Sequence, residues 1–146
     1  MFKGTFGDIG ITKEEFEKNG INLLERPFFT FVRRMVAYKC PDLEVDILYG
    51  PDFRERIIRA GAVIFIGGRE FDLGGGYLFA DAQKKRIREL IQQDPRMKYH
   101  IIYISNHNVF TSWLIQQGTD FGGMLSWEDN EAGPTSITNA QQNGAP

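Results

Sequence analysis

Four consecutive polar residues at positions 105–108 are the part of this chain best suited to chemistry. They follow a β-branched and aromatic segment over 99–105 and precede a segment with helical periodicity. Ligands of open α/β sheets collect where a strand ends and a helix begins, because the helix N-terminus supplies amide donors for an anion. His107 could act there as a general base or a metal ligand, with Ser105 or Thr111 as its polar neighbour. The candidate ligand or hydrolytic site consists of Ser105, Asn106, His107 and Asn108.

An alternative interpretation of the same four residues is purely structural. Asn and Ser are common turn and cap residues, which would leave His107 as an exposed loop histidine. His100 lies seven residues earlier, and about 20 Å away if the strand is extended at ~3.3 Å per residue, so the two histidines are not expected to share a metal ion. The single cysteine, Cys40, excludes a zinc site built from cysteines. We therefore predict neither a metal ion nor a cofactor.

Three carboxylates form a second possible site. Glu44 and Asp46 would share one face of an alternating strand over 43–49, with Asp52 just beyond it. Such a group could bind a divalent cation, but no lysine follows on the next strand in the arrangement that nucleases use. Acidic residues on the exposed face of a strand more often keep the sheet solvated and discourage edge-to-edge pairing. We adopt that interpretation.

A third pattern combines glycines, aromatic residues and basic residues. Three glycines at 74–76 precede Tyr77 and Phe79, but neither GK[ST] nor GxGxxG accompanies them, so a phosphate-binding loop is not indicated. Residues 75–91 resemble the third strand and second helix of the RNA recognition motif, a family in which a glycine-aromatic strand stacks bases. The resemblance departs at the first strand, where only Tyr49 could stack. The candidate nucleic-acid residues that it implies are Tyr77, Phe79, Lys84, Lys85 and Arg88.

The C-terminal part of the chain differs from the rest in charge. All 17 Lys and Arg residues lie before position 99, and residues 101–146 carry four acidic side chains. Blocks biased to one sign commonly serve as interaction segments. We therefore predict one α+β domain over 1–117 and an acidic, polar arm over 118–146, which is partly disordered unless bound to a partner. Large side chains of the kind enriched at interfaces would anchor this arm: Phe121, Met124, Leu125 and Trp127.

Hydrophobic periodicity predicts the elements that position these residues. We expect helices over 13–19, 27–40, 52–60, 81–93 and 109–117, strands over 43–49, 62–66 and 99–105, and a hairpin turn at 67–68 with a returning strand over 69–73. From residue 43 onward this order matches a ferredoxin-like βαββαβ core over 43–105, with an N-terminal helical pair and a C-terminal helix plus extended tail added. The alternative is a small three-layer α/β domain in which some strands pair in parallel.

Length and composition limit the class of protein. A chain of 146 residues that is 42% hydrophobic can build one core without disulfides. Residues 26–100 carry 14 basic and 10 acidic side chains, a modest excess beside that of a dedicated nucleic-acid binder. No apolar run is long enough to span a bilayer, and residues 1–10 lack the layout of a signal peptide. We expect a soluble, cytoplasmic protein with no membrane contact.

These observations lead to one expected function and two alternatives. We expect a non-catalytic assembly or adaptor protein that binds partner subunits, or further copies of itself, through the arm, as a small component of a larger particle such as a viral one. The first alternative is a small-ligand-binding protein or hydrolase with its site at residues 105–108. The second is a nucleic-acid-binding module that uses Tyr77, Phe79 and the basic helix over 84–88.

Overall fold

The computed structural model describes residues 9–10, 13–18, 25–70, 76–105, 107–123, 125, 141–142 and 144. Its centre is a four-stranded sheet in the order β3-β2-β1-β4, in which every strand pair is parallel. The strands are β1 (Phe28–Arg34), β2 (Val63–Arg69), β3 (Ile101–Ile104) and β4 (Phe121–Gly122). The mixture of helices and strands agrees with the predicted class, but the ferredoxin-like order is not confirmed because this sheet is parallel throughout.

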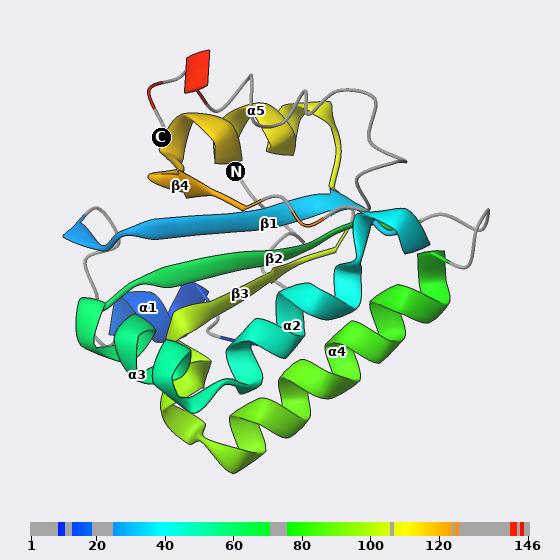
Figure 1. Ribbon diagram of the computed structural model, residues 1–146. Helices are drawn as coiled ribbons and strands as arrows, with labels where there is room; N and C mark the ends of the chain where they lie inside the picture. The colour runs from blue at the N-terminus through cyan, green and yellow to red at the C-terminus, as the bar shows by residue number, and fades with distance from the viewer. Residues whose placement is uncertain are drawn as a thin grey trace.

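Helices cover both faces of the sheet (Figure 1). They are α1 (Lys13–Lys18), α2 (Pro41–Tyr49), α3 (Pro51–Ala60), α4 (Gly76–Gln93) and α5 (Val109–Gly118), with short 3-10 helices η2 (Ala37–Lys39) and η3 (Pro95–His100). Because successive strand residues point to opposite faces, Phe31 packs with side chains of α2 and α4, whereas Val32 packs with Ile115 of α5. The sheet therefore separates two hydrophobic clusters, and the molecule has three layers.

β1 is a central strand, although the sequence predicted a helix over 27–40. Apolar residues recur at helical spacing over 28–35, but both faces of this strand are covered, one through Phe31 and the other through Val32. A strand buried on both faces gives a nearly continuous apolar run, which periodicity does not separate from a buried helix. The prediction was wrong for this reason.

α2 occupies the segment for which the sequence predicted a strand over 43–49. Pro41 lies in the first turn, where its missing N–H costs no hydrogen bond. Asp42 lies in the same turn, where its negative charge interacts favourably with the positive end of the helix dipole. The buried residues of α2 follow helical spacing: Pro41, Glu44, Val45 and Leu48. One of these buried positions is the acidic Glu44, so the pattern of apolar residues alone does not reveal the buried face of the helix.

β2 continues through Gly67 and Gly68, where the sequence predicted a hairpin. Both glycines pair in register with neighbours on β1 or β3, and their φ angles are 118° and 157°. A Cβ atom on Gly67 would lie 2.4 Å from the carbonyl oxygen of Ile104. The glycines therefore allow neighbouring parallel strands to approach each other closely. In the sequence alone, a glycine pair with this role looks the same as a glycine pair in a hairpin turn. Of the predicted returning strand over 69–73, residues 71–73 lie outside the described part of the chain.

The remaining described helices occur close to where the sequence predicted them. α1 and α3 are confirmed, and Gly61, with a φ of 64°, is the C-cap of α3. α4 begins at Gly76, so Tyr77 and Phe79 lie in its first turn and the strand expected for them is wrong. The predicted strand over 99–105 is β3, and the N-cap of α5 is Asn108, one of the two asparagines at 105–108 that could cap this helix.

The connections of the sheet reverse direction between β1 and β4. The chain passes from β1 to β2 to β3 through helices on one face and then returns through α5, on the opposite face, to place β4 beside β1 (Figure 1). Parallel strands end on the same edge, and the connections that leave β1 and enter β4 lie on opposite faces. In open α/β sheets this point of reversal leaves a crevice at the carboxyl ends of the strands, where ligands bind.

Candidate functional site

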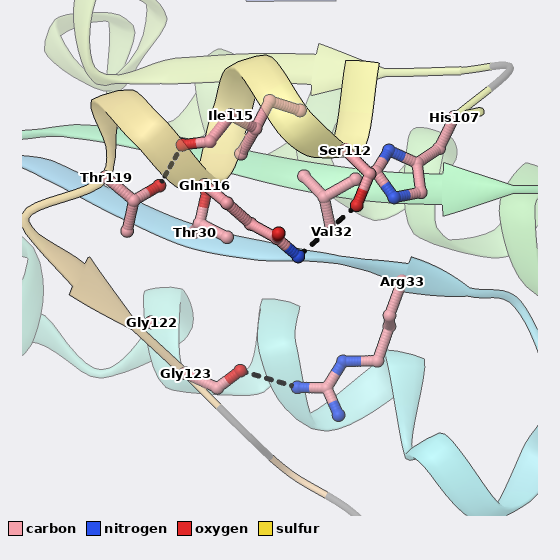
Figure 2. Close-up of a pocket in the computed structure, with 10 residues that line it drawn as sticks. All are labelled: Thr30, Val32, Arg33, His107, Ser112, Ile115, Gln116, Thr119, Gly122 and Gly123. Carbon is pink, nitrogen blue, oxygen red and sulfur yellow. Dashed lines mark hydrogen bonds between the residues drawn. The ribbon is translucent and has the colours of Figure 1, made fainter. Parts of the chain in front are cut away.

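A small hollow lies beside this point of reversal, between α5, β1 and β4 (Figure 2). Its lining comes from β1, the start and body of α5, and the end of β4: Thr30, Val32, Arg33, His107, Ser112, Ile115, Gln116, Thr119, Gly122 and Gly123. Its free volume of about 30 Å³ holds one or two water molecules or one small functional group. The hollow is therefore sized for part of a ligand and not for a whole drug-sized molecule.

His107, which the sequence identified as the most reactive candidate, lines this hollow. Its side chain is partly buried, and burial lowers the pKa of its imidazole below the usual value. The ring is therefore neutral at pH 7. Its Nδ1 lies 3.4 Å from Thr111 Oγ1, the neighbour proposed from the sequence. A neutral imidazole in a polar hollow can accept a proton or a hydrogen bond from a ligand.

The other residues of the predicted ligand site have different positions. Asn108 is the N-cap of α5: its Oδ1 accepts from the N–H of Thr111 at 3.0 Å, and Thr111 Oγ1 accepts from the N–H of Asn108 at 2.8 Å. This capping box occupies the Asn108 side chain, as the structural interpretation expected. Ser105 is partly buried just after β3 and does not line the hollow, and Asn106 lies outside the described residues.

The sequence reasoning missed every polar residue of the described lining other than His107: Thr30, Arg33, Ser112, Gln116 and Thr119. Gln116 Nε2 donates to Ser112 Oγ at 3.3 Å, on adjacent turns of α5. Thr30 contributes a buried hydroxyl that has no hydrogen-bond partner among the residues that the structure describes. Thr30 could not be found because its strand was predicted as a helix, whereas the one-turn spacing of Ser112 and Gln116 on an expected helix was a signal that could have been used.

Arg33 is the one formally charged residue of the described lining, and its guanidinium lies on the face of the sheet that α2 covers. Figure 2 shows its side chain leaving β1 on the side away from α5 and reaching toward Gly123. Nη2 donates to the carbonyl of Gly123 at 3.0 Å, and Nη1 donates to the carbonyl of Leu125 at 3.1 Å. Its Nε lies 2.9 Å from Oε1 of Glu44 on α2. Arg33 thus holds the chain after β4 against the sheet.

The three carboxylates considered as a cation site are separated by the fold. Glu44 is buried, Asp46 forms an ion pair with Arg86, and Asp52 is exposed in the first turn of α3. Within the described ranges no group of three or more His, Cys, Asp or Glu side chains is arranged to hold a metal ion.

The candidate nucleic-acid residues lie along α4. Tyr77 is 49% exposed, whereas Phe79 packs against the core. Residues two apart on a helix do not face each other, so the two rings form no stacking surface of the kind expected. The basic residues have separate surroundings: Lys84 lies 2.7 Å from Glu70, Lys85 lies 3.9 Å from Glu89, and Arg88 is exposed.

Two predicted anchors of the arm lie against the body of the protein. Phe121 belongs to β4 and stacks on Phe29, with ring centroids 4.8 Å apart, while 44% of its surface stays exposed. Leu125 packs against the hydrophobic cluster on the α2 and α4 face. Met124 and Trp127 lie outside the described residues. Among the helices described, none is both long and apolar enough to cross a membrane.

Comparison of the chain with protein-family models found no match. Comparison with curated proteins likewise found none. The function proposed below therefore rests on the position and chemistry of the hollow.

Proposed function

We propose that this protein binds a small polar ligand in the hollow between β1, β4 and α5. The observation that carries the proposal is the reversal of strand order at this hollow, because doubly wound sheets bind their ligands at that point whatever their chemistry. A ligand group seated here would meet hydroxyl, amide and imidazole groups from Thr30, Ser112, Gln116 and His107. These side chains can both donate and accept hydrogen bonds, which supports recognition of a polar group over an apolar one.

The same geometry supports a hydrolytic variant of this proposal. The hollow has room for a water molecule beside a neutral His107. His107 could accept a proton from that water as the water oxygen attacks a bound ester or phosphoester, and could return the proton to the departing alkoxide, so that an acid and an alcohol are the products. Carboxylates are absent from the described lining, so His107 would act without an acidic partner. Ligand binding alone is therefore the simpler form of the proposal.

Two adjacent glutamines provide a matched test. Gln116 lines the hollow, whereas Gln117 follows it on α5 and is exposed. A fragment library of small polar molecules would be titrated into ¹⁵N-labelled protein and followed by amide chemical shifts. We expect hits that shift His107, Ser112 and Gly123, and we expect Gln116→Ala and His107→Ala to weaken them at least about tenfold while Gln117→Ala leaves them unchanged. Equal effects of the two glutamine variants would refute the site.

A second candidate is assembly through the C-terminal region, because α5 exposes large apolar side chains. Val109, Phe110 and Trp113 are 85%, 63% and 52% exposed, and α5 contains no charged residue. Exposed apolar groups that lie together often mark protein interaction sites. We infer that this face, with the arm over 118–146, would bind partner subunits or further copies of the chain.

Self-assembly can be tested separately from ligand binding. Light scattering coupled to size exclusion would give the mass of the parent, of Trp113→Ser and of a chain ending at residue 125, which keeps β4. We expect both variants to shift the mass toward the monomer with little change in the melting temperature. A parent chain that is monomeric at every concentration would exclude assembly with its own copies.

A further inference from the structure

Two arginines lie side by side where β1 and β2 end (Figure 1). Arg34 is the last residue of β1 and Arg69 is the last residue of β2, and the parallel register of the two strands pairs them directly. Both residues are exposed. Neighbouring strands are about 4.8 Å apart, and like charges placed directly opposite each other are destabilising. The pair is therefore unfavourable unless a negatively charged group shares it.

The alternation of side chains along the strands places both arginines on the face of the sheet that α5 covers. Val32, two residues before Arg34, packs with Ile115 of α5. Phe65, four residues before Arg69, belongs to the same hydrophobic cluster. Residues two or four apart on a strand point to the same face, so the two arginines share the face of Val32 and Phe65.

The opposite face of the sheet carries ion pairs at the same edge. Arg33 of β1 lies 2.9 Å from Glu44 of α2. Glu70, directly after β2, lies 2.7 Å from Lys84 of α4. α5, by contrast, contains no charged residue. In the described part of this edge, unlike charges are therefore adjacent on the face of α2 and α4, whereas like charges are adjacent on the face of α5.

The guanidinium of Arg34 is positioned by a neutral partner. Its Nη2 donates to the phenol oxygen of Tyr38, in η2, at 3.1 Å. This contact orients the guanidinium without neutralising its charge. A guanidinium has several N–H donors in a planar fork, so the bond to Tyr38 leaves others for a ligand.

We propose that Arg34 and Arg69 together bind a doubly charged oxyanion of the kind that a phosphate monoester presents. Two adjacent guanidinium groups match two negative charges, and each can donate a planar pair of hydrogen bonds to the oxygens of such a group. A carboxylate, which carries a single charge, would neutralise only half of the pair.

This inference rests on the proposed ligand-binding function and adds a second contact point for the same ligand. Val32 lines the hollow, and Arg34 follows it on the same face, about 7 Å further along β1. A ligand whose uncharged polar part occupies the hollow can therefore place an anionic group at the two arginines. The small volume of the hollow agrees with this arrangement, since it has room for only part of a ligand.

Three tetrahedral sulfur compounds separate the effect of charge from that of shape. Sulfate carries two negative charges, methanesulfonate carries one and dimethyl sulfone carries none. Each would be titrated into the full ¹⁵N-labelled chain at constant ionic strength and followed by backbone amide and arginine Nε–H shifts. We expect sulfate to shift Arg34 and Arg69 and to bind at least about fivefold more tightly than methanesulfonate, with no shift there from dimethyl sulfone. Equal affinities for the two anions would overturn the match of charges.

Single substitutions provide the matched comparison. Arg34→Gln and Arg69→Gln each remove one charge and keep a polar side chain, and each should weaken sulfate binding at least about fivefold. Arg59→Gln is the control, because Arg59 is also exposed but lies in the last turn of α3, before β2 begins. It should leave the affinity for sulfate within about twofold of the parent. Equal losses in the three variants would show only a general attraction of anions to a basic surface, and the site would be refuted.

Thermal melting gives an independent measurement of the repulsion between the two arginines. In a buffer free of polyvalent anions, Arg34→Gln and Arg69→Gln should melt at a higher temperature than the parent, because each removes the contact between like charges. Added sulfate should raise the melting temperature of the parent more than that of either variant. Lower melting temperatures for both variants in the sulfate-free buffer would show that the chain itself neutralises the pair, and the proposed site would be wrong.

The outcomes separate this inference from the function on which it rests. If neutral fragments shift the hollow and sulfate does not shift the two arginines, the ligand-binding hollow stands and the anion site is wrong. If sulfate shifts the two arginines and no fragment perturbs the hollow, the anion site stands and the proposed function fails. We expect both kinds of probe to bind, and to bind together, because they occupy separate parts of the α5 face.

Discussion

Arg33 and Gly68 are directly paired across β1 and β2, and a Cβ atom placed on Gly68 would lie 1.5 Å from the carbonyl oxygen of Arg33. No side chain fits there without separating the two strands. This contact brings the carboxyl end of β2 against Arg33, one of the residues that line the hollow. Gly68, the second glycine of a pair that resembles a hairpin turn in the sequence, is therefore required for Arg33 to occupy its observed position.

Gly68→Ala should therefore destabilise the protein strongly. Strand separation and backbone strain together should lower the free energy of unfolding by about 2 to 4 kcal/mol, measured by urea denaturation. Gly118→Ala is the matched control, because nothing lies within 4 Å of a Cβ atom at that position. It should leave stability unchanged or slightly increased. Similar losses in the two variants would contradict the close packing of β1 on β2.

Stability should fall as the pH rises from about 4.5 to about 8, because of Glu44. Its pKa is raised from 4.5 in the unfolded chain to about 8 in the folded protein. The folded state then binds one more proton than the unfolded state inside this window, and deprotonation favours unfolding as the pH increases. Below the window, this contribution to stability is fully present.

The contribution of Glu44 can be isolated with Glu44→Gln. Urea denaturation of parent and variant at several pH values would give a stability difference that changes by roughly 1 kcal/mol per pH unit inside the window. Comparing the two chains removes the effects of groups that titrate equally in both, the histidines included. A difference that is flat from pH 5 to pH 8 would show that Glu44 is ionised in the folded state over that range.

Asn108→Ala should cost about 1 kcal/mol of stability, because it removes half of the capping box of α5. Asn108→Ser is the control, since serine can accept the same hydrogen bond from the N–H of Thr111. Thermal melting would compare the two variants with the parent. A serine variant as unstable as the alanine variant would mean that Asn108 acts through contacts other than the cap.

Features of this structure that depend on neighbouring residues in the sequence could be predicted, whereas features that depend on the assembled sheet could not. A cap at Asn106 or Asn108 could be expected from the sequence, and Asn108 is the N-cap, because a capping box is a local arrangement that sequence alone can specify. β1 was missed because its aromatic residues face two different helical layers, and that arrangement exists only after the sheet forms. Tertiary burial overrides periodicity in such a strand.

The candidate site was predicted in part for the same reason. His107 was identified from its place between an expected strand and an expected helix, which are both present. Its partners on β1 lie more than 70 residues earlier in the chain. They lie near His107 only because the chain turns back after β3, passes through α5 on the opposite face of the sheet, and places β4 beside β1. Glu44 was noticed as an acid but placed on a solvated strand, whereas the helix α2 turns it into the interior.

The imidazole of His107 should titrate below its usual value, because burial in the hollow disfavours the charged ring. An NMR titration of the ring protons, assigned with His107→Ala, should give a midpoint below pH 6.5. Ile115→Ala removes an apolar wall of the hollow and admits water, so it should move the midpoint back toward 6.5. A midpoint at or above 6.5 in the parent would show that the ring is charged more easily than its burial implies. A lowered pKa keeps the ring uncharged at neutral pH, and it also makes the imidazole a weaker base than one whose pKa lies near the operating pH.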